Sequence, residues 1–123
     1  MKTGMPFLFT DAGKLSGEGF VLRVRTRLRT KDELLSFYNE AGGCPGYFGM
    51  NWDAFEEVLN DFSWIKEPQI QIVHEDLPLS SEKKALGVYL DILRSASVNN
   101  PGRLFVRFPI SVREEVIRVL SEK

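Results

Sequence analysis

The sequence has few of the residues that build disulfides and metal sites. It contains one cysteine, Cys44, and one histidine, His74, in 123 residues. A single cysteine cannot form an internal disulfide, and one cysteine with one histidine is too small a set for a Cys/His metal site. This composition is typical of a protein from a reducing compartment. We therefore expect a cytoplasmic protein with no metal and no cofactor.

Long hydrophobic runs are also missing. Residues 1–10 carry one lysine and a short apolar run that Pro6 interrupts. Such a segment is too weak for a secretory signal and too short for a membrane span. We therefore expect a soluble protein. The length of 123 residues fits one compact domain, which can fold without disulfides or metal.

Charge is balanced overall but unevenly distributed. The net charge is −1, from 17 acidic and 16 basic residues, which indicates neither a polycation nor a strongly acidic decoy. No Lys or Arg occurs from residue 41 to residue 65. That window holds the acids Asp53, Glu56, Glu57 and Asp61, whereas Arg23, Arg25, Arg27 and Arg29 follow one another earlier in the chain. The pattern predicts one negative and one positive region on the surface.

Three segments alternate apolar and polar residues as strands do. They span residues 20–29, 69–74 and 103–108. In the first, Phe20, Leu22 and Val24 point to one side and the arginines to the other. Each predicted strand keeps one polar face. The earlier apolar run at residues 7–10 ends in a turn and is assigned to an N-terminal extension.

Helical patterns fill the intervals between the predicted strands. Thr30 and Glu33 have the spacing of a capping box before a helix that stops near residues 42–43. Asn51 is predicted to cap a helix from Trp52 to about Phe62. Two further predicted helices run from Ser80 or Ser81 to the turn at 99–102, and from residue 111 to residue 120.

The order of elements predicts the fold class. Strands separated by helices indicate parallel pairing through right-handed crossovers. Because each strand keeps a polar face, we expect a two-layer α/β fold in which a small three-stranded parallel sheet has helices packed mainly on one face. The other face is expected to be partly open and basic. Residues 20–109 form the predicted domain, with a 1–19 N-terminal extension and a 110–123 C-terminal helical extension.

Residues 46–59 form the most specific segment, GYFGMNWDAFEEVL. An aromatic pair, a glycine, a capping asparagine and an Asp-Ala dipeptide open its helix. This segment resembles the signature of the barstar family, small intracellular protein inhibitors of ribonucleases, and the order of elements from residue 20 to 108 is similar to that family's fold. The resemblance implies a non-enzymatic protein whose partner is a small basic secreted ribonuclease, with no membrane and no direct nucleic-acid contact.

The implied mechanism is phosphate mimicry. Carboxylates on a rigid helix can occupy the phosphate position of a cationic active site and accept charge-assisted hydrogen bonds there. The predicted partner-binding residues are Tyr47, Gly49, Asn51, Trp52, Asp53, Glu56, Glu57, Asp61, Asp91 and Ser95. Asp53 and Glu57, four residues apart, would project together. The family's best known member has aspartate and tryptophan where this chain has Glu57 and Glu56, and an acid where it has Ser95, so the target ribonuclease stays open.

Three other interpretations stay open. Acids near a helix N-terminus are favoured by the macrodipole, so Asp53 and Glu56 could serve the helix alone. A basic sheet face with Arg23, Arg25, Arg27, Arg103 and Arg107 could bind RNA or an acidic protein, although such a surface usually carries more stacking aromatics than Phe105. Cys44 with His74 could form a thiol enzyme, but no motif links two residues thirty positions apart.

Overall fold

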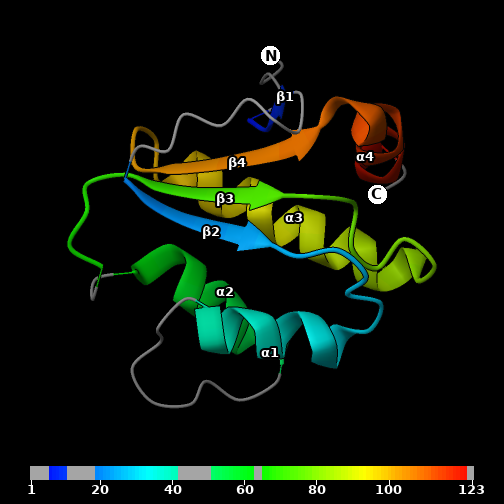
Figure 1. The fold of residues 1–123 in the computed structure, drawn as a ribbon, viewed down its shortest axis with the longest axis horizontal. Coiled ribbons are helices and arrows are strands. Elements are labelled where there is room, and N and C mark those ends of the chain that lie inside the picture. The colour runs from blue at the N-terminus through cyan, green and yellow to red at the C-terminus, as the bar shows by residue number, and fades with distance from the viewer. Residues whose placement is uncertain (1–5, 11–18, 42–50, 63–64, 122–123) are drawn as a thin grey trace.

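A computed structural model of the chain describes residues 6–10, 19–41, 51–62 and 65–121. In chain order the elements are β1 (Leu8–Thr10), β2 (Phe20–Val24), α1 (Lys31–Ala41), α2 (Trp52–Asp61), β3 (Ile70–His74), α3 (Lys83–Asn99), β4 (Leu104–Pro109), the short 3₁₀ turn η1 (Ile110–Val112) and α4 (Arg113–Ser121). Figure 1 shows how they are arranged around one sheet. Among the described residues, none of the helices is long and apolar enough to cross a membrane.

The sheet has four parallel strands in the order β1-β4-β3-β2, not the three that the sequence predicts. The additional strand comes from the segment assigned to the N-terminal extension: Phe9 of β1 pairs with Phe108 of β4. The rings of Phe7 and Phe9 lie 5.3 and 6.1 Å from that of Phe108. A three-residue strand is too short to be predicted from alternation. The aromatic contacts of β1 add to the stabilisation that its short backbone ladder gives.

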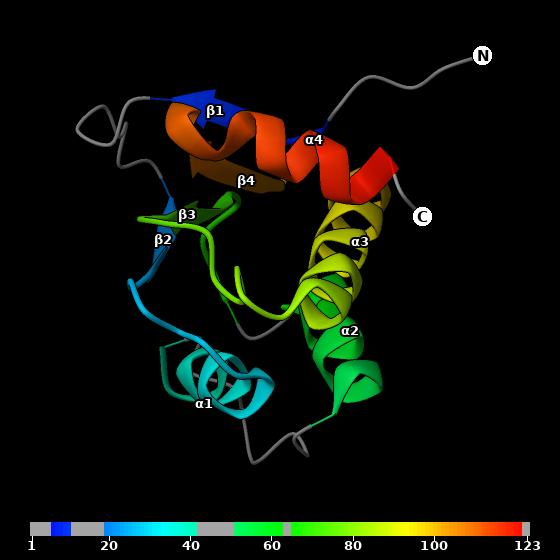
Figure 2. The ribbon, with the colours of Figure 1, turned by 90° about the vertical axis from the view of Figure 1, so that its right-hand side faces the viewer.

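The predicted two-layer α/β class is confirmed. Figure 2 shows α2 and α3 on one side of the sheet, with α1 beyond β2 and α4 near β1 and β4. The core between the layers takes aliphatic side chains from both, including Leu22, Ile72 and Val106 from the sheet and Leu86, Leu90 and Leu93 from α3. Val116 of α4 is also buried in this core. The helical layer therefore holds α2 against a continuous apolar support.

The expectation of a polar face on every strand is wrong for β3, which is buried along its whole length. Gln71 and His74 are each only 3% exposed. The amide oxygen of Gln71 accepts a hydrogen bond of 2.9 Å from Nε of Arg107, so the polar residue is satisfied inside the sheet. A strand between two neighbours is covered more completely than its alternation indicates.

The first long strand is also shorter than predicted, because β2 ends at Val24 and not at residue 29. Beyond it, Arg27 adopts a positive φ of 66° and its backbone N–H donates to Oδ2 of Asp76 at 3.2 Å. A left-handed residue breaks the extended backbone that a strand needs. The alternating arginines from 25 to 29 therefore lie outside the sheet.

Two of the four predicted helix starts are confirmed. The backbone N–H of Glu33 donates to Oγ1 of Thr30 at 3.1 Å, and Oε1 of Glu33 accepts from the Thr30 N–H at 3.3 Å, which completes the capping box. Oδ1 of Asn51 accepts from the Ala54 N–H at 2.8 Å. The third is wrong, because α3 begins at Lys83 after Glu82, whose side chain makes no capping hydrogen bond.

Gly19 immediately precedes β2 and tests how closely the start of this strand approaches Gln69, which precedes β3. It has a positive φ of 75°, and a Cβ there would collide with the Gln69 carbonyl oxygen. Gly102 has a similar φ of 80° with open space around it. We expect Gly102→Ala to lower the free energy of unfolding by about 1–2 kcal/mol, the cost of a left-handed alanine. Gly19→Ala should lower it clearly more, because it adds a steric collision. Urea unfolding of both variants measures this, and equal losses would contradict the steric argument.

Candidate functional site

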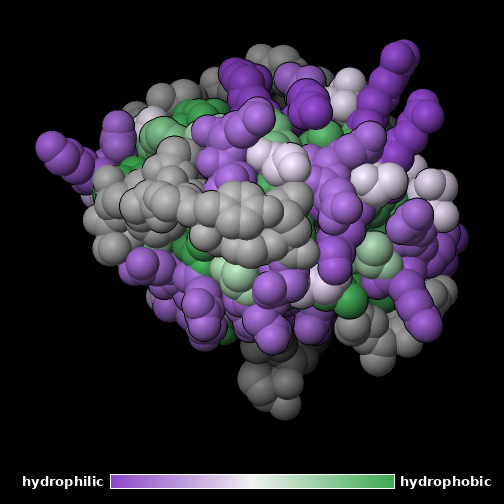
Figure 3. Space-filling view, turned by 90° about the horizontal axis from the view of Figure 1, so that it is seen from below, coloured by the Kyte–Doolittle hydropathy of each residue, from purple (hydrophilic) through white to green (hydrophobic). Residues whose placement is uncertain are grey.

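The acidic residues of α2 all lie on its exposed side. Phe55 and Leu59 are buried, Trp52 and Val58 are half-buried, and Asp53, Glu56, Glu57 and Asp61 are exposed. The helix contains no Lys or Arg. Figure 3 shows the side of the molecule that carries α1 and α2, where hydrophilic residues cover much of the described surface. The structure thus brings the four predicted acids onto one face, with Asp53 and Glu57 one turn apart.

Aromatic packing fixes the buried side of α2. The Phe55 ring lies 4.8 Å from the ring of Tyr38 on α1 and 5.9 Å from the ring of Tyr89 on α3. Trp52 lies 6.0 Å from Phe55, and Nζ of Lys31 sits 5.8 Å from the Trp52 ring centre, within cation–π distance. Asn51, a predicted site residue, holds the first turn as its cap. Trp52 therefore serves the anchoring of the helix, and its half-buried ring leaves some surface exposed.

Polar contacts from distant segments fix the other end of α2. The Arg103 guanidinium donates to the carbonyl oxygens of Asp61, Phe62 and Ile65 at 3.3, 3.0 and 3.1 Å. Oδ1 of Asn60 accepts from the side-chain amides of Asn99 and Asn100 at 3.3 and 3.4 Å. A cation at a helix C-terminus interacts favourably with its dipole and its last carbonyl groups. These contacts present the acidic face as a rigid unit.

Asp91 and Ser95 lie on α3, next to α2. Oδ1 of Asp91 accepts from Arg94 at 2.7 Å, and the two side chains are 42% and 41% exposed. Ser95 lines a recess of about 290 Å³ together with Arg94, Val98 and Asn99. Because Asn99 also bonds to Asn60, this recess adjoins α2. Asp91 is thus already paired within the chain, whereas Tyr47, Gly49 and Cys44 lie outside the described residues.

Of the arginines predicted for a basic sheet face, Arg23 of β2 and Arg107 of β4 lie on the same face, because both are in register with Val73 of β3. Arg23 is exposed on β2, but the Arg25 guanidinium lies 5.9 Å above the Phe37 ring of α1, so Arg25 belongs with that helix. Arg103 bonds to the end of α2, and Arg107 bonds to Gln71. Arg25, Arg103 and Arg107 therefore each make a contact within the fold, which reduces what the predicted basic face offers to RNA or an acidic protein.

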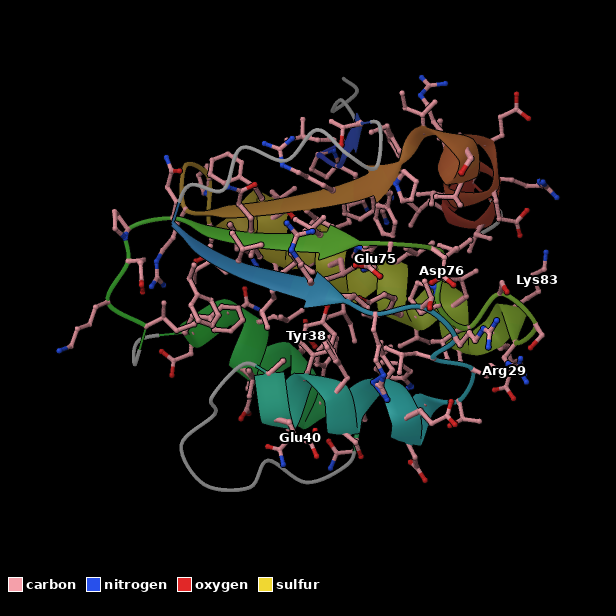
Figure 4. The ribbon with its side chains drawn as sticks, in the orientation of Figure 1. Arg29, Tyr38, Glu40, Glu75, Asp76 and Lys83 are labelled. Atoms are coloured by element: carbon pink, nitrogen blue, oxygen red, sulfur yellow. The ribbon has the colours of Figure 1, made fainter. Side chains whose placement is uncertain are left out.

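His74 is buried at the end of β3 and has partners at both ring nitrogens. Nδ1 lies 2.9 Å from the Arg107 carbonyl oxygen, Nε2 lies 2.7 Å from the Tyr89 hydroxyl, and that hydroxyl lies 2.7 Å from the hydroxyl of Tyr38. Figure 4 shows Tyr38 directed from α1 into the interior. Burial lowers the pKa of His74 to about 4 and raises the pKa of both tyrosines. A histidine occupied in this way cannot serve Cys44 as a general base, so the thiol-enzyme hypothesis lacks its second group.

The residues that hold the acidic helix in place are not predicted from the sequence. The alternation of its strand places Arg103 on the sheet face, and Asn60, Tyr38 and Tyr89 are not among the predicted site residues. A signal existed for the tyrosines: both stand on apolar helix faces, where a buried hydroxyl needs a hydrogen-bond partner. Nothing in the sequence links Arg103 to α2, because they meet only through the crossover to β4.

Together these observations define a small two-layer α/β domain that exposes a firmly anchored acidic helix. A family model described as Barstar (barnase inhibitor) matches residues 20–109, which include β2, α1, α2, β3, α3 and β4. The chain therefore belongs to the barstar family. No curated protein and no solved structure matches it.

Proposed function

We propose that the chain is a non-enzymatic, intracellular inhibitor of a small basic ribonuclease and binds through the exposed face of α2. Asp53 and Glu57 enter the cationic active site and take the place of substrate phosphate. The observation that carries the proposal is the placement of four acids on the exposed face of a helix whose buried face and C-terminus are both anchored. Membership of the barstar family supports the same assignment.

The chemistry of a ribonuclease site fits this surface. A site that holds phosphate presents Arg, Lys and His donors, and carboxylates accept strong charge-assisted hydrogen bonds from them. Preorganisation reduces the entropy lost on binding, because the helix is already held in place before the partner arrives. Tyr47 and Gly49, which precede α2 in the sequence, belong to the proposed interface, together with Asn51 and Trp52 at the helix start. Asp91 and Ser95 extend it along α3.

Stoichiometric inhibition is the direct test. The purified chain is titrated into barnase, and into the small basic ribonucleases secreted by the host cell, while hydrolysis of an RNA substrate is followed. We expect the activity of at least one enzyme to fall linearly to zero near one equivalent. The Asp53→Ala/Glu57→Ala double variant is the matched control and should inhibit weakly. Unchanged activity of every enzyme at excess protein would overturn the proposal, as would binding of RNA by the chain itself.

Glu56 and Asp61 are expected to act mainly on the association rate. Both are exposed on the same helix, Glu56 next to Glu57 and Asp61 one turn beyond it. Exposed charges at the rim of an interface steer encounter and are screened by salt, whereas buried charges control dissociation. Glu56→Ala and Asp61→Ala should each slow association at low ionic strength and leave the dissociation rate nearly unchanged. Surface plasmon resonance at two salt concentrations measures both rates, and a faster dissociation would place these acids at the centre of the contact.

A further inference from the structure

The hydrogen bonds of His74 fix the direction of a buried proton chain. A carbonyl oxygen can only accept, so Nδ1 of His74 carries a hydrogen and donates to the Arg107 carbonyl. In the neutral ring, Nε2 is then an acceptor, and the Tyr89 hydroxyl must donate to it. The oxygen of Tyr89 is left to accept from the Tyr38 hydroxyl. The chain runs from Tyr38 through Tyr89 to His74 and links α1, α3, β3 and β4.

The hydrogen-bonded chain Tyr38–Tyr89–His74 lies directly beneath α2. Both tyrosine rings pack against Phe55, the buried aromatic residue at the centre of the acidic helix. The His74 ring stacks on Phe108 at 4.0 Å between ring centres, so it has an apolar neighbour on one face. A protonated ring would put a hydrogen on Nε2, facing the Tyr89 O–H that now donates to it. The hydroxyl groups would have to reorient around a buried charge, and the packing under Phe55 rests on their present positions.

No ionised side chain among the described residues is hydrogen-bonded to His74 to offset that charge. The groups that face it are the Tyr89 hydroxyl from α3, with Tyr38 of α1 behind it, and the backbone carbonyl from β4. The Arg107 guanidinium bonds to Gln71 instead, and from β2 the residue in register is Val24. Next along the chain, Glu75 is exposed and Asp76 accepts from the Arg27 amide.

We propose that the Tyr38–Tyr89–His74 chain is an acid-sensitive latch that holds α2 in its binding position at neutral pH and loosens it when His74 is protonated. The regulatory part of this proposal rests on the proposed ribonuclease-binding function, because the latch would release the partner in acid. The structural part concerns the free protein and can be tested without a ribonuclease.

The pH window follows from the two states of His74. Burial lowers its pKa from 6.5 to about 4 in the folded protein, whereas a loosened state that hydrates the ring returns it towards 6.5. The loosened state therefore takes up a proton as the pH falls from 6.5 to 4. The stabilisation from neutral His74 is fully present above about pH 6.5 and is lost through this window. Between pH 7.5 and pH 5, the opening equilibrium should rise by a factor of roughly 25.

A single histidine makes the test unambiguous, since His74 is the only one in the chain. Nitrogen-15 NMR of the free protein should show the neutral Nδ1–H tautomer at pH 7 and a pKa close to 4. Hydrogen exchange of the α2 amides, corrected for the intrinsic rate, should reveal the roughly 25-fold rise in opening at pH 5. The control His74→Gln should show no such rise. A titration near 6.5, or the same rise in both proteins, would overturn the latch.

Two further measurements keep the proposal decisive. If His74→Gln does not fold, Tyr89→Phe removes the hydroxyl partner of Nε2 and should change the His74 pKa; an unchanged pKa would contradict the chain. For the regulatory part, the affinity ratio between pH 7.5 and pH 5 for the inhibited ribonuclease should be larger for the wild type than for His74→Gln. Equal ratios would remove the regulation and leave the latch. Absence of any ribonuclease binding would overturn the proposed function and the regulation, while NMR and exchange still decide the latch.

Discussion

Replacing Asp53 or Glu57 with alanine is expected to weaken the complex with the ribonuclease at least about tenfold each, mainly through faster dissociation. Truncating a buried, hydrogen-bonded charge at an interface costs about 2–5 kcal/mol, because the partner's charge is left without its counterion. Both carboxylates are exposed in the free protein, one turn apart on a helix with no basic residue. Binding therefore breaks few contacts of these carboxylates within the fold. It removes their hydration, and only hydrogen-bond donors of the enzyme can offset that desolvation cost.

The two substitutions should not be additive. Asp53 and Glu57 would meet donors in the same cationic cleft, so removing one already relaxes the network that the other uses. The double variant should lose less than the sum of the single losses. Glu114→Ala is the matched control, because this exposed acid lies on α4, on the other side of the molecule from α2 (Figure 2). Wild-type affinity in both single variants would exclude phosphate mimicry for this protein, even if inhibition itself were observed.

We expect these substitutions to leave the fold unchanged, so that a loss of binding can be assigned to the interface. The N-terminal anchoring of α2 depends on Asn51, whose side chain caps the helix, and on Phe55 beneath it. Neither contact involves the carboxylates of Asp53 or Glu57. The alternative that these acids serve only the helix macrodipole predicts a different result: a small loss of stability, about 0.3–1 kcal/mol, without a specific loss of affinity. Thermal unfolding measured beside binding separates the two.

Local sequence patterns predicted the parts of the fold that local physics determines. The cap at Asn51 and the capping box at Thr30 each need only three or four consecutive residues, and both are confirmed. The acidic face of α2 follows from helical periodicity in the same way. The prediction was wrong where a distant segment decides the outcome. Phe9 lies in the sheet because it pairs with β4 and its ring packs against Phe108. β2 ends early because Arg27 adopts a left-handed backbone whose N–H donates to Asp76.

The support of the site was the least predictable part, because it depends on contacts between crossovers. The sequence pattern predicts that Arg107 is a surface arginine, but in the structure it donates a hydrogen bond to Gln71 of the neighbouring strand. His74 stands at the end of a predicted strand, and its hydrogen-bond partner Tyr89 comes from α3, which the strand pattern does not contain. Polar residues in these segments are satisfied by each other, and hydropathy alone assigns them to the solvent. Their identification requires the register of β3 and β4, which no single strand contains.

Among the arginines predicted for the basic sheet face, Arg103 is expected to contribute most to the free energy of unfolding. Its guanidinium donates to the carbonyl groups of the last residue of α2 and of two residues beyond it, and it is half-buried. The last turn of the helix carries no basic residue of its own, so a side chain more than forty positions away supplies the cation. Hydrogen bonds from a charged group contribute about 1.5–3 kcal/mol, and removing this one leaves several acceptors without donors at once.

We therefore expect Arg103→Ala to lower the free energy of unfolding by about 2–3 kcal/mol, with water replacing part of the lost donation. Arg103→Lys should recover part of this, because an ammonium keeps the charge but not the planar fork that reaches separate carbonyl groups. Arg94→Ala is the control: its ion pair with Asp91 is exposed and should contribute about 0–1 kcal/mol. Urea unfolding of the three variants gives the comparison. Equal stability of Arg103→Ala and Arg94→Ala would mean that the end of α2 is held by Asn60 and its partners alone, whereas the expected order would identify Arg103 as the residue that couples the acidic helix to the sheet.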